Sequence, residues 1–150
     1  MTDLKRREEI LEKYKDLYKY YHKKEGRVWP IAWGFEHGDG WLTLVEKLSS
    51  VIQYHVEEKQ KIDPEFPSVE VHQCKEKFGK LRFYTNGTDD FVRGAITLAE
   101  VMSGKICEIC GLPGKLYQTG WWRVRCDSCE EKRQKEMQEI ASQAEKKESQ

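Results

Sequence analysis

Four of the five cysteines lie in two closely spaced pairs, and no other feature of the chain limits its fold as strongly. Two residues separate Cys107 from Cys110, two separate Cys126 from Cys129, and fifteen lie between the pairs. This spacing is typical of a four-cysteine zinc site, because one tight turn can present two sulfur atoms to a tetrahedral ion at about 2.3 Å. Four thiolates leave no open coordination position, so we expect one structural Zn²⁺ ion.

Two other uses of paired cysteines compete with the zinc interpretation. Disulfides are disfavoured because the charged N-terminus does not resemble a secretory signal and no long apolar run suggests a membrane span, which together favour a cytoplasmic protein. A redox site would need only one Cys-x-x-Cys motif, usually in a βαβ setting. Cys74 lies outside the spacing, and we interpret it as a small buried residue.

The cysteine-bearing segment is predicted to form a finger of three parts. Gly111 follows the first pair and would let the backbone fold over the ion without steric conflict. Turn pairs at 113–114 and 119–120 predict a short hairpin between the two cysteine pairs. The second pair opens a charged helix, with Asp127 and Ser128 as capping candidates. A turn, a hairpin and a helix in this order resemble a treble-clef-like or ribbon-like finger.

Upstream of the finger, hydrophobic periodicity predicts three helices and two strands. Gly26 is expected to end the first helix, Asp39 and Thr88 to cap the second and third, and Gly104 to follow the third. The expected helices span 3–24, 40–58 and 89–103; the strands centre on 69–71 and 81–85 with a connection at 75–80, and a Trp-rich ordered loop fills 27–40.

These elements indicate an α+β fold in which helices pack on a small antiparallel sheet and a C-terminal four-cysteine zinc finger with a helical tail closes the chain. We expect a core domain at 1–104, the zinc finger at 105–130 and a polar helical tail at 131–150. The tail carries only a weak apolar stripe, formed by Met137, Ile140 and Ala144.

Charge is balanced over the whole chain but not along it. The sequence holds 26 basic and 26 acidic side chains, which argues against a general polyanion binder. Residues 75–125 nevertheless hold 9 basic and 5 acidic side chains, a local net charge of +4. Four metal-bound thiolates would lower that surplus, so any affinity for phosphate should reside in a small shaped patch.

The strongest candidate for such a patch is the segment 75–84, which interleaves cations with aromatic residues. Alternation predicts that Leu81 and Phe83 face the core and leave the polar side chains exposed. Cations beside an aromatic ring suit a phosphate and a stacked base, whereas lysines that protect an edge strand from aggregation are the competing interpretation. The candidate ligand-binding residues here are Lys77, Lys80, Arg82 and Tyr84.

Two further groups of residues suggest chemistry. Trp121, Trp122 and Arg123 form a second aromatic and basic cluster beside the predicted metal site, suited to a ligand or a partner surface. His37 and Asp39 lie close together in a Gly-rich loop and allow a hydrolase hypothesis, although a turn and a helix cap explain them equally. The sequence has no phosphate-binding Gly-rich loop, no Gly-x-Ser-x-Gly motif and no His-Glu-x-x-His motif.

Three motifs follow one another in the order of a recognisable pattern. They are Gly40-Trp41, the run Lys-Glu-Lys-Phe-Gly-Lys-Leu-Arg-Phe-Tyr at 75–84 and the cysteine motifs at 107–129. The combination resembles a group of small uncharacterised zinc-finger proteins of bacteriophage and prophage genomes, over about residues 34–130. A weaker likeness relates the finger to that of the DksA/TraR-type transcription regulators, which act on RNA polymerase. The first resemblance implies an accessory protein that binds a host protein, nucleic acid or a signalling nucleotide.

Three functional hypotheses follow. The first is a non-enzymatic zinc-binding accessory protein whose basic and aromatic patch binds a nucleotide or nucleic acid, with a role in counter-defence. The second is an adaptor or inhibitor that binds a host protein, such as the transcription machinery, through Trp121, Trp122 and the C-terminal helix. The third is a hydrolase that uses His37 and Asp39.

Overall fold

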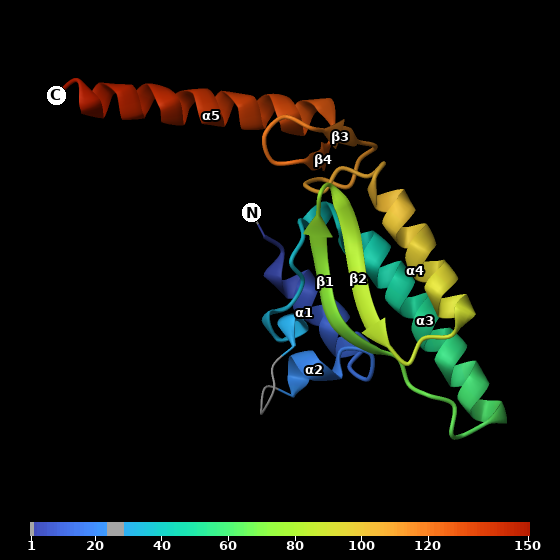
Figure 1. The fold of residues 1–150 in the computed structure, drawn as a ribbon. Coiled ribbons are helices and arrows are strands. Elements are labelled where there is room, and N and C mark those ends of the chain that lie inside the picture. Colours follow the sequence, from blue (N-terminus) through green and yellow to red (C-terminus); the bar gives the residue numbers. More distant parts are fainter. Residues whose placement is uncertain (1, 24–28) are drawn as a thin grey trace.

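The computed structural model describes residues 2–23 and 29–150, and its α+β architecture confirms the predicted fold class. Two small antiparallel sheets, each a hairpin, are combined with five α-helices (Figure 1). In chain order the elements are α1 (Leu4–Lys13), α2 (Lys19–His22), the 3-10 turns η1 (Pro30–Trp33) and η2 (Asp39–Trp41), α3 (Leu42–Ile62), β1 (Glu70–Lys77), β2 (Lys80–Asn86), α4 (Asp90–Ser103), β3 (Lys115–Tyr117), β4 (Arg123–Arg125) and α5 (Asp127–Glu148).

The main hydrophobic core lies between the β1–β2 hairpin and the helices. Leu81 and Phe83 point into it from β2, as the alternation predicted, and Trp41 and Ile52 meet them from the helical side. Cys74 is fully buried in the same core, where burial raises the pKa of its thiol, so it behaves as the small apolar residue that we expected.

Side chains of α4 cover the open edge of β2. The Leu81 N–H donates to Ser103 Oγ at 2.9 Å, and the Phe83 N–H donates to Glu100 Oε1 at 3.2 Å. An edge strand normally exposes such N–H groups as a template for another chain. Here α4 satisfies two of them, which also fixes the helix against the sheet.

The edge of β1 is covered by the loop that precedes η2. The Glu36 N–H donates to the Cys74 carbonyl at 2.8 Å, and the Glu76 N–H donates to the Glu36 carbonyl at 2.9 Å, which makes a short parallel bridge. The hairpin therefore has backbone or side-chain partners along both edges.

The expected single helix over 3–24 is wrong. α1 ends at Lys13, the chain turns, and only the short α2 follows. The turn allows Leu17 and Tyr18 to be buried, with the Tyr18 hydroxyl 2.6 Å from Ser49 Oγ. The Leu17 carbonyl accepts the Val71 N–H at 3.0 Å, so β1 takes a bond that a continuous helix would have used. Gly26, the expected stop, lies outside the described residues.

Three of the predicted helix caps are also wrong. Asp39 begins η2 and does not cap α3, which extends to Ile62, beyond the expected end at residue 58. α4 is capped by Asp89, whose carboxylate accepts the Val92 N–H, and not by Thr88. In α5 the cap is Cys126, whose sulfur accepts the Cys129 N–H, in place of Asp127 or Ser128.

The end of α4 at Ser103 matches the expectation, whereas the conformation of Gly104 and the length of the connection between the strands do not. Gly104 ends α4 with a φ of −67°, so this glycine does not take the left-handed conformation of a typical residue after a helix. The expected connection at 75–80 shrinks to the two residues Phe78 and Gly79, because both strands extend to the turn.

α5 runs without a break across the expected 130/131 boundary, and the division into three domains stays a prediction.

Candidate functional site

The four paired cysteines gather into one cluster at the C-terminal end of the fold. Their sulfur atoms all lie within 4.8 Å of one another, which suits a single metal ion. Cys107 and Cys110 come from the turn after α4, whereas Cys126 and Cys129 come from the start of α5. The Sγ atoms of Cys110 and Cys126, from different pairs, are 3.7 Å apart. The predicted ligand set is therefore brought together as a candidate metal centre.

Local backbone geometry positions each cysteine pair. Gly111 adopts a φ of +81°, which glycine tolerates, and its N–H donates to the Cys107 carbonyl at 2.9 Å to close the first turn. At the second pair, the Cys129 N–H donates to Cys126 Sγ at 3.4 Å across the first turn of α5. The short β3–β4 hairpin joins the two turns, as the glycine pairs predicted.

The sulfur cluster is electrostatically suited to a cation. Burial alone would raise the pKa of the Cys107 thiol, but N–H groups of Cys110, Cys126 and Ile109 stabilise the thiolate and hold the pKa at about 7. Burial and the neighbouring cysteine side chains raise the pKa of Cys129 well above its usual value. A bound cation would reinforce the lowered pKa of Cys107 and offset the raised pKa of Cys129, because a cation stabilises the deprotonated sulfur that metal ligation requires.

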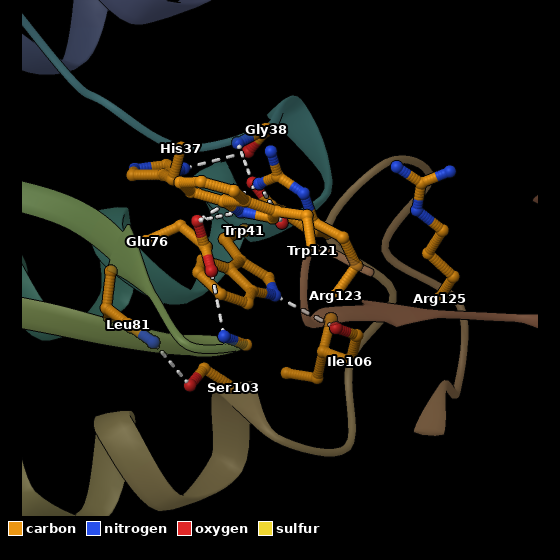
Figure 2. Close-up of polar contacts among 12 residues, drawn as sticks. His37, Gly38, Trp41, Glu76, Leu81, Ser103, Ile106, Trp121, Arg123 and Arg125 are labelled. Atoms are coloured by element: carbon orange, nitrogen blue, oxygen red, sulfur yellow. Dashed lines mark hydrogen bonds and ion pairs between the residues drawn. The ribbon is translucent and has the colours of Figure 1, made fainter. Parts of the chain in front are cut away.

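A glycine-rich loop of the core receives the first cysteine turn. The Gly40 N–H donates to the Glu108 carbonyl at 2.8 Å, and a Cβ at Gly40 would lie only 2.1 Å from the Cys107 carbonyl oxygen. The Trp41 indole N–H donates to the Ile106 carbonyl at 2.9 Å (Figure 2). The Gly-Trp motif therefore joins the finger to the core, since only glycine permits this approach.

An ion-pair cluster of two buried carboxylates and a half-buried arginine makes a second link between the core and the finger. Arg123 of β4 donates to Glu76 of β1 at 3.0 Å and lies 3.5 Å from Glu108 in the cysteine turn. The Trp121 indole N–H also donates to Glu76 at 3.4 Å. Figure 2 shows the side chains of Glu76, Trp121 and Arg123 converging. Arg123, a predicted ligand-binding residue, is thus already engaged by two carboxylates. Glu76 and Glu108 lie within the motifs at 75–84 and 107–129, but sequence patterns gave no sign that these residues, 32 positions apart, share one arginine.

The structure gives His37 and Asp39 separate partners. The His37 Nδ1–H donates to the Gly38 carbonyl at 2.8 Å, and burial lowers the pKa of the ring to about 4. Asp39 accepts hydrogen bonds from the Arg7 side chain at 2.9 Å and from the Asp3 N–H at 2.7 Å. Within the described residues these contacts fix the loop and form no paired acid and base.

Four cations lie on one face of the β1–β2 hairpin, which we call the cationic face. Lys77 is paired across the strands with Lys80, and Lys75 with Arg82. Tyr84 follows on the same face. Arg82 lies 3.5 Å from Glu100, whereas the three lysines make no ion pair within the parts of the chain that the structure covers. The predicted residues Lys77, Lys80, Arg82 and Tyr84 therefore share one surface, to which the structure adds Lys75.

Aromatic side chains gather where this hairpin meets the finger. Phe78 at the β1–β2 turn and Trp122 before β4 make an edge-to-face contact with ring centroids 6.2 Å apart. Trp121 lies next to Trp122, with the Arg123 guanidinium 5.4 Å from its ring. We refer to Phe78, Trp121 and Trp122 as the tip aromatics. Phe78 was not among the predicted site residues, although its position between two lysines was a signal.

No family model, curated protein or solved structure gives a significant match to this chain. The resemblances to phage proteins and to the DksA/TraR-type finger therefore stay predictions. Within residues 2–23 and 29–150, no helix combines the length and the apolar character needed to cross a bilayer.

Proposed function

We propose that the four cysteines bind one structural Zn²⁺ ion in a treble-clef-like finger. The support is the donor set, because four sulfur atoms in a compact cluster match the preferences of Zn²⁺ and leave no position for a substrate. Cys107 and Cys110 would hold the ion from the turn after α4, and Cys126 and Cys129 from the start of α5. The ion would hold these two segments together, so its role in this proposal is structural and not catalytic.

The protein itself acts, in this proposal, as a non-enzymatic binder of a phosphate-bearing ligand on the cationic face. One observation carries the proposal: two successive cross-strand pairs, Lys77 with Lys80 and Lys75 with Arg82, place like charges directly opposite each other. Such pairs destabilise a hairpin. An anionic ligand would remove the repulsion, so the arrangement is explained by binding better than by folding.

The competing interpretation of these lysines, protection of an exposed strand edge, loses its basis in this fold. Ser103 and Glu100 already occupy N–H groups on the edge of β2, and Glu36 pairs with the edge of β1. Lys77 and Lys80 project from the face of the hairpin, where they do not block strand addition. An accessory protein of phage type that captures a nucleotide or nucleic acid during counter-defence would use such a surface.

A protein-binding adaptor is the second candidate, and α5 is the observation that favours it. The helix projects away from the rest of the fold (Figure 1). Met137 and Ile140 are exposed on it, three residues apart and hence on one side. A host protein could cover this stripe without competing for the cationic face.

Replacing Lys75, Lys77 and Lys80 together by Gln tests the phosphate-binding proposal. The matched control replaces Lys132, Lys135 and Lys146, three exposed lysines of α5, by Gln, so that both variants lose the same charge. The probe is a fluorescent single-stranded oligonucleotide of mixed sequence, with inorganic triphosphate as the competitor. We expect the first variant to bind at least about tenfold more weakly and to lower the slope of log K against log salt by about 2.

The control variant should keep the affinity and the salt dependence of the natural chain. Equal weakening in both triple variants would show a general charge effect and would refute a specific cationic face. An adaptor would bind the probe weakly in every form and would show little dependence on salt.

A further inference from the structure

Phe78 occupies a backbone conformation that its residue type disfavours. With Phe78 at a φ of +52° and Gly79 at +75°, both residues of the two-residue turn are left-handed, as in the type I′ turns that close hairpins. Asn, Asp or Gly is preferred at the first of these positions, and a bulky side chain with positive φ is rare. Among the non-glycine residues that the structure describes, Phe78 alone has a positive φ.

The Phe78 side chain does not contribute to the core, so packing does not explain its presence. It is 64% exposed, whereas Leu81 and Phe83 further along the same hairpin are buried. An unfavourable backbone conformation combined with an exposed aromatic ring indicates a functional role. The Lys77 Nζ atom lies 5.8 Å from the ring centroid, so a cation accompanies the ring.

The two tryptophans extend this exposed surface from the finger. Trp121 is 71% exposed and Trp122 is 41% exposed, in contrast to the fully buried Trp41. Trp121 is nevertheless held in place, since its indole N–H donates to Glu76 at 3.4 Å and its ring lies over Arg123. Such fixed, exposed rings need little ordering when a flat ligand group stacks on them.

The finger also holds the turn that carries Phe78. Glu76 accepts the Gly79 N–H at 2.8 Å and receives Arg123 through its other oxygen. A Cβ at Gly79 would lie 2.4 Å from the Leu116 side chain, which shows how closely β3 packs on the turn. The tip aromatics are therefore fixed by both hairpins, and Phe78 adjoins the cationic face through its contact with Lys77.

We propose that the ligand of this surface is single-stranded nucleic acid, with unpaired bases stacked on the tip aromatics and the backbone lying along the cationic face. This inference rests on the proposed phosphate binding and specifies which class of phosphate-bearing ligand is bound. Exposed aromatic rings beside a basic strip are the common arrangement in single-strand binding, because every base has a face that can stack. A duplex hides those faces within its own stack, so it would contact only the lysines.

The test compares three probes of equal length, about twelve nucleotides each: oligothymidine, an abasic strand with the same phosphates, and a duplex. The natural chain should bind oligothymidine about tenfold more tightly than the abasic strand. Phe78→Asn and Trp122→Leu should abolish that preference and leave abasic binding unchanged. Trp33→Leu is the matched control, because Trp33 is 75% exposed on η1 and far in sequence from this surface.

Folding can be separated from binding, because Asn suits the left-handed turn position and Phe78→Asn should melt at or above the temperature of the natural chain. Equal affinity for oligothymidine and the abasic strand would overturn base stacking while phosphate binding stands. Tighter binding of the duplex would overturn the single-strand assignment. If the triple lysine variant bound all three probes normally, the proposed function itself would fail.

Discussion

The two hairpins of this protein share a topology but depend on different forces. β1 and β2 are eight and seven residues long and bury Leu81 and Phe83 against the helices. β3 and β4 have three residues each, and Val124 is their only buried side chain. A hairpin this small is not stable alone in water, so the cysteine cluster must supply what the finger lacks in apolar contacts. The first hairpin is stabilised by its core, whereas the proposed stabilisation of the second depends on a metal ion held by the four cysteines.

The smaller hairpin nevertheless fixes the larger one at its turn. Arg123 lies between the buried carboxylates of Glu76 and Glu108, so a half-buried cation connects the turn of the first hairpin to the cysteine turn. Removing one member of such a cluster leaves an uncompensated buried charge. We therefore expect metal binding at the cysteines to influence the arrangement of the tip aromatics through these three side chains.

Loss of the metal should have the largest effect and should separate the two hairpins. Structural zinc contributes about 10–16 kcal/mol of apparent binding energy in finger peptides. We expect chelation, or Cys110→Ser, to remove amide protection from residues 107–126 while β1 and β2 stay protected, as measured by hydrogen exchange. Cys74→Ala is the control, because Cys74 lies outside the cluster and this variant should retain one metal ion per chain.

Elemental analysis of the natural chain tests the assignment of zinc to the four cysteines independently of hydrogen exchange. A chain without zinc, or a finger whose amides stay protected after chelation, would contradict the proposed role of the cysteines.

Gly40→Ala should have the next largest effect, since it tests the contact between the core and the finger. The new Cβ would lie 2.1 Å from the Cys107 carbonyl oxygen and 2.6 Å from the Gly111 nitrogen, and both are backbone atoms that cannot rotate away. We expect a loss of about 3 kcal/mol or more in urea unfolding. Gly94→Ala is the matched control, since a Cβ there meets nothing within 4 Å and should stabilise α4 by about 0.5–1 kcal/mol.

A Gly40→Ala variant as stable as the natural chain would mean that the finger does not need to pack on the loop at Gly38 to Trp41. In that case we expect the finger to unfold independently of the core.

The elements that local signals specify could be predicted from the sequence. The cysteine spacing indicated a metal centre, and alternation placed Leu81 and Phe83 in the core. Local rules failed where a distant partner determined the outcome. The N-terminal helix breaks because the Leu17 carbonyl bonds to Val71, and Asp39 leaves its expected cap position because Arg7 engages it. No periodicity in the chain encodes such contacts.

The candidate ligand surface shows the same limit. Alternation correctly grouped Arg82 and Tyr84 on one face, but the cross-strand register was needed to show that Lys77 and Lys80 lie directly opposite each other on the same face. The aromatic run suggested stacking, yet only the fold shows that Phe78 and Trp122 meet across 44 positions of the chain. The link from Arg123 to Glu76 likewise depends on tertiary packing.

The smallest expected effect is a pH dependence of stability that arises in the loop at His37. This loop contacts β1 through Glu36 and the cysteine turn through Gly38. Burial lowers the pKa of His37 to about 4 from a usual value of 6.5, so the unfolded chain binds a proton that the folded chain excludes between these values. Stability should be full above pH 6.5 and should fall as pH drops towards 4, with a loss of about 2 kcal/mol between pH 7 and pH 5. Urea titrations at both values measure this loss.

His37→Phe should remove that pH dependence even though it weakens the loop, because the difference between the two pH values isolates the titrating ring. His22→Gln, at an exposed position on α2, should keep the dependence of the natural chain. The loop at His37 packs on the cysteine turn through Gly38 and Gly40, so part of the loss should appear as weaker protection of the finger. If His37→Phe lost stability with pH as steeply as the natural chain, the buried ring would not be the group that links the core to acid, and the cysteine ligands would become the next group to test.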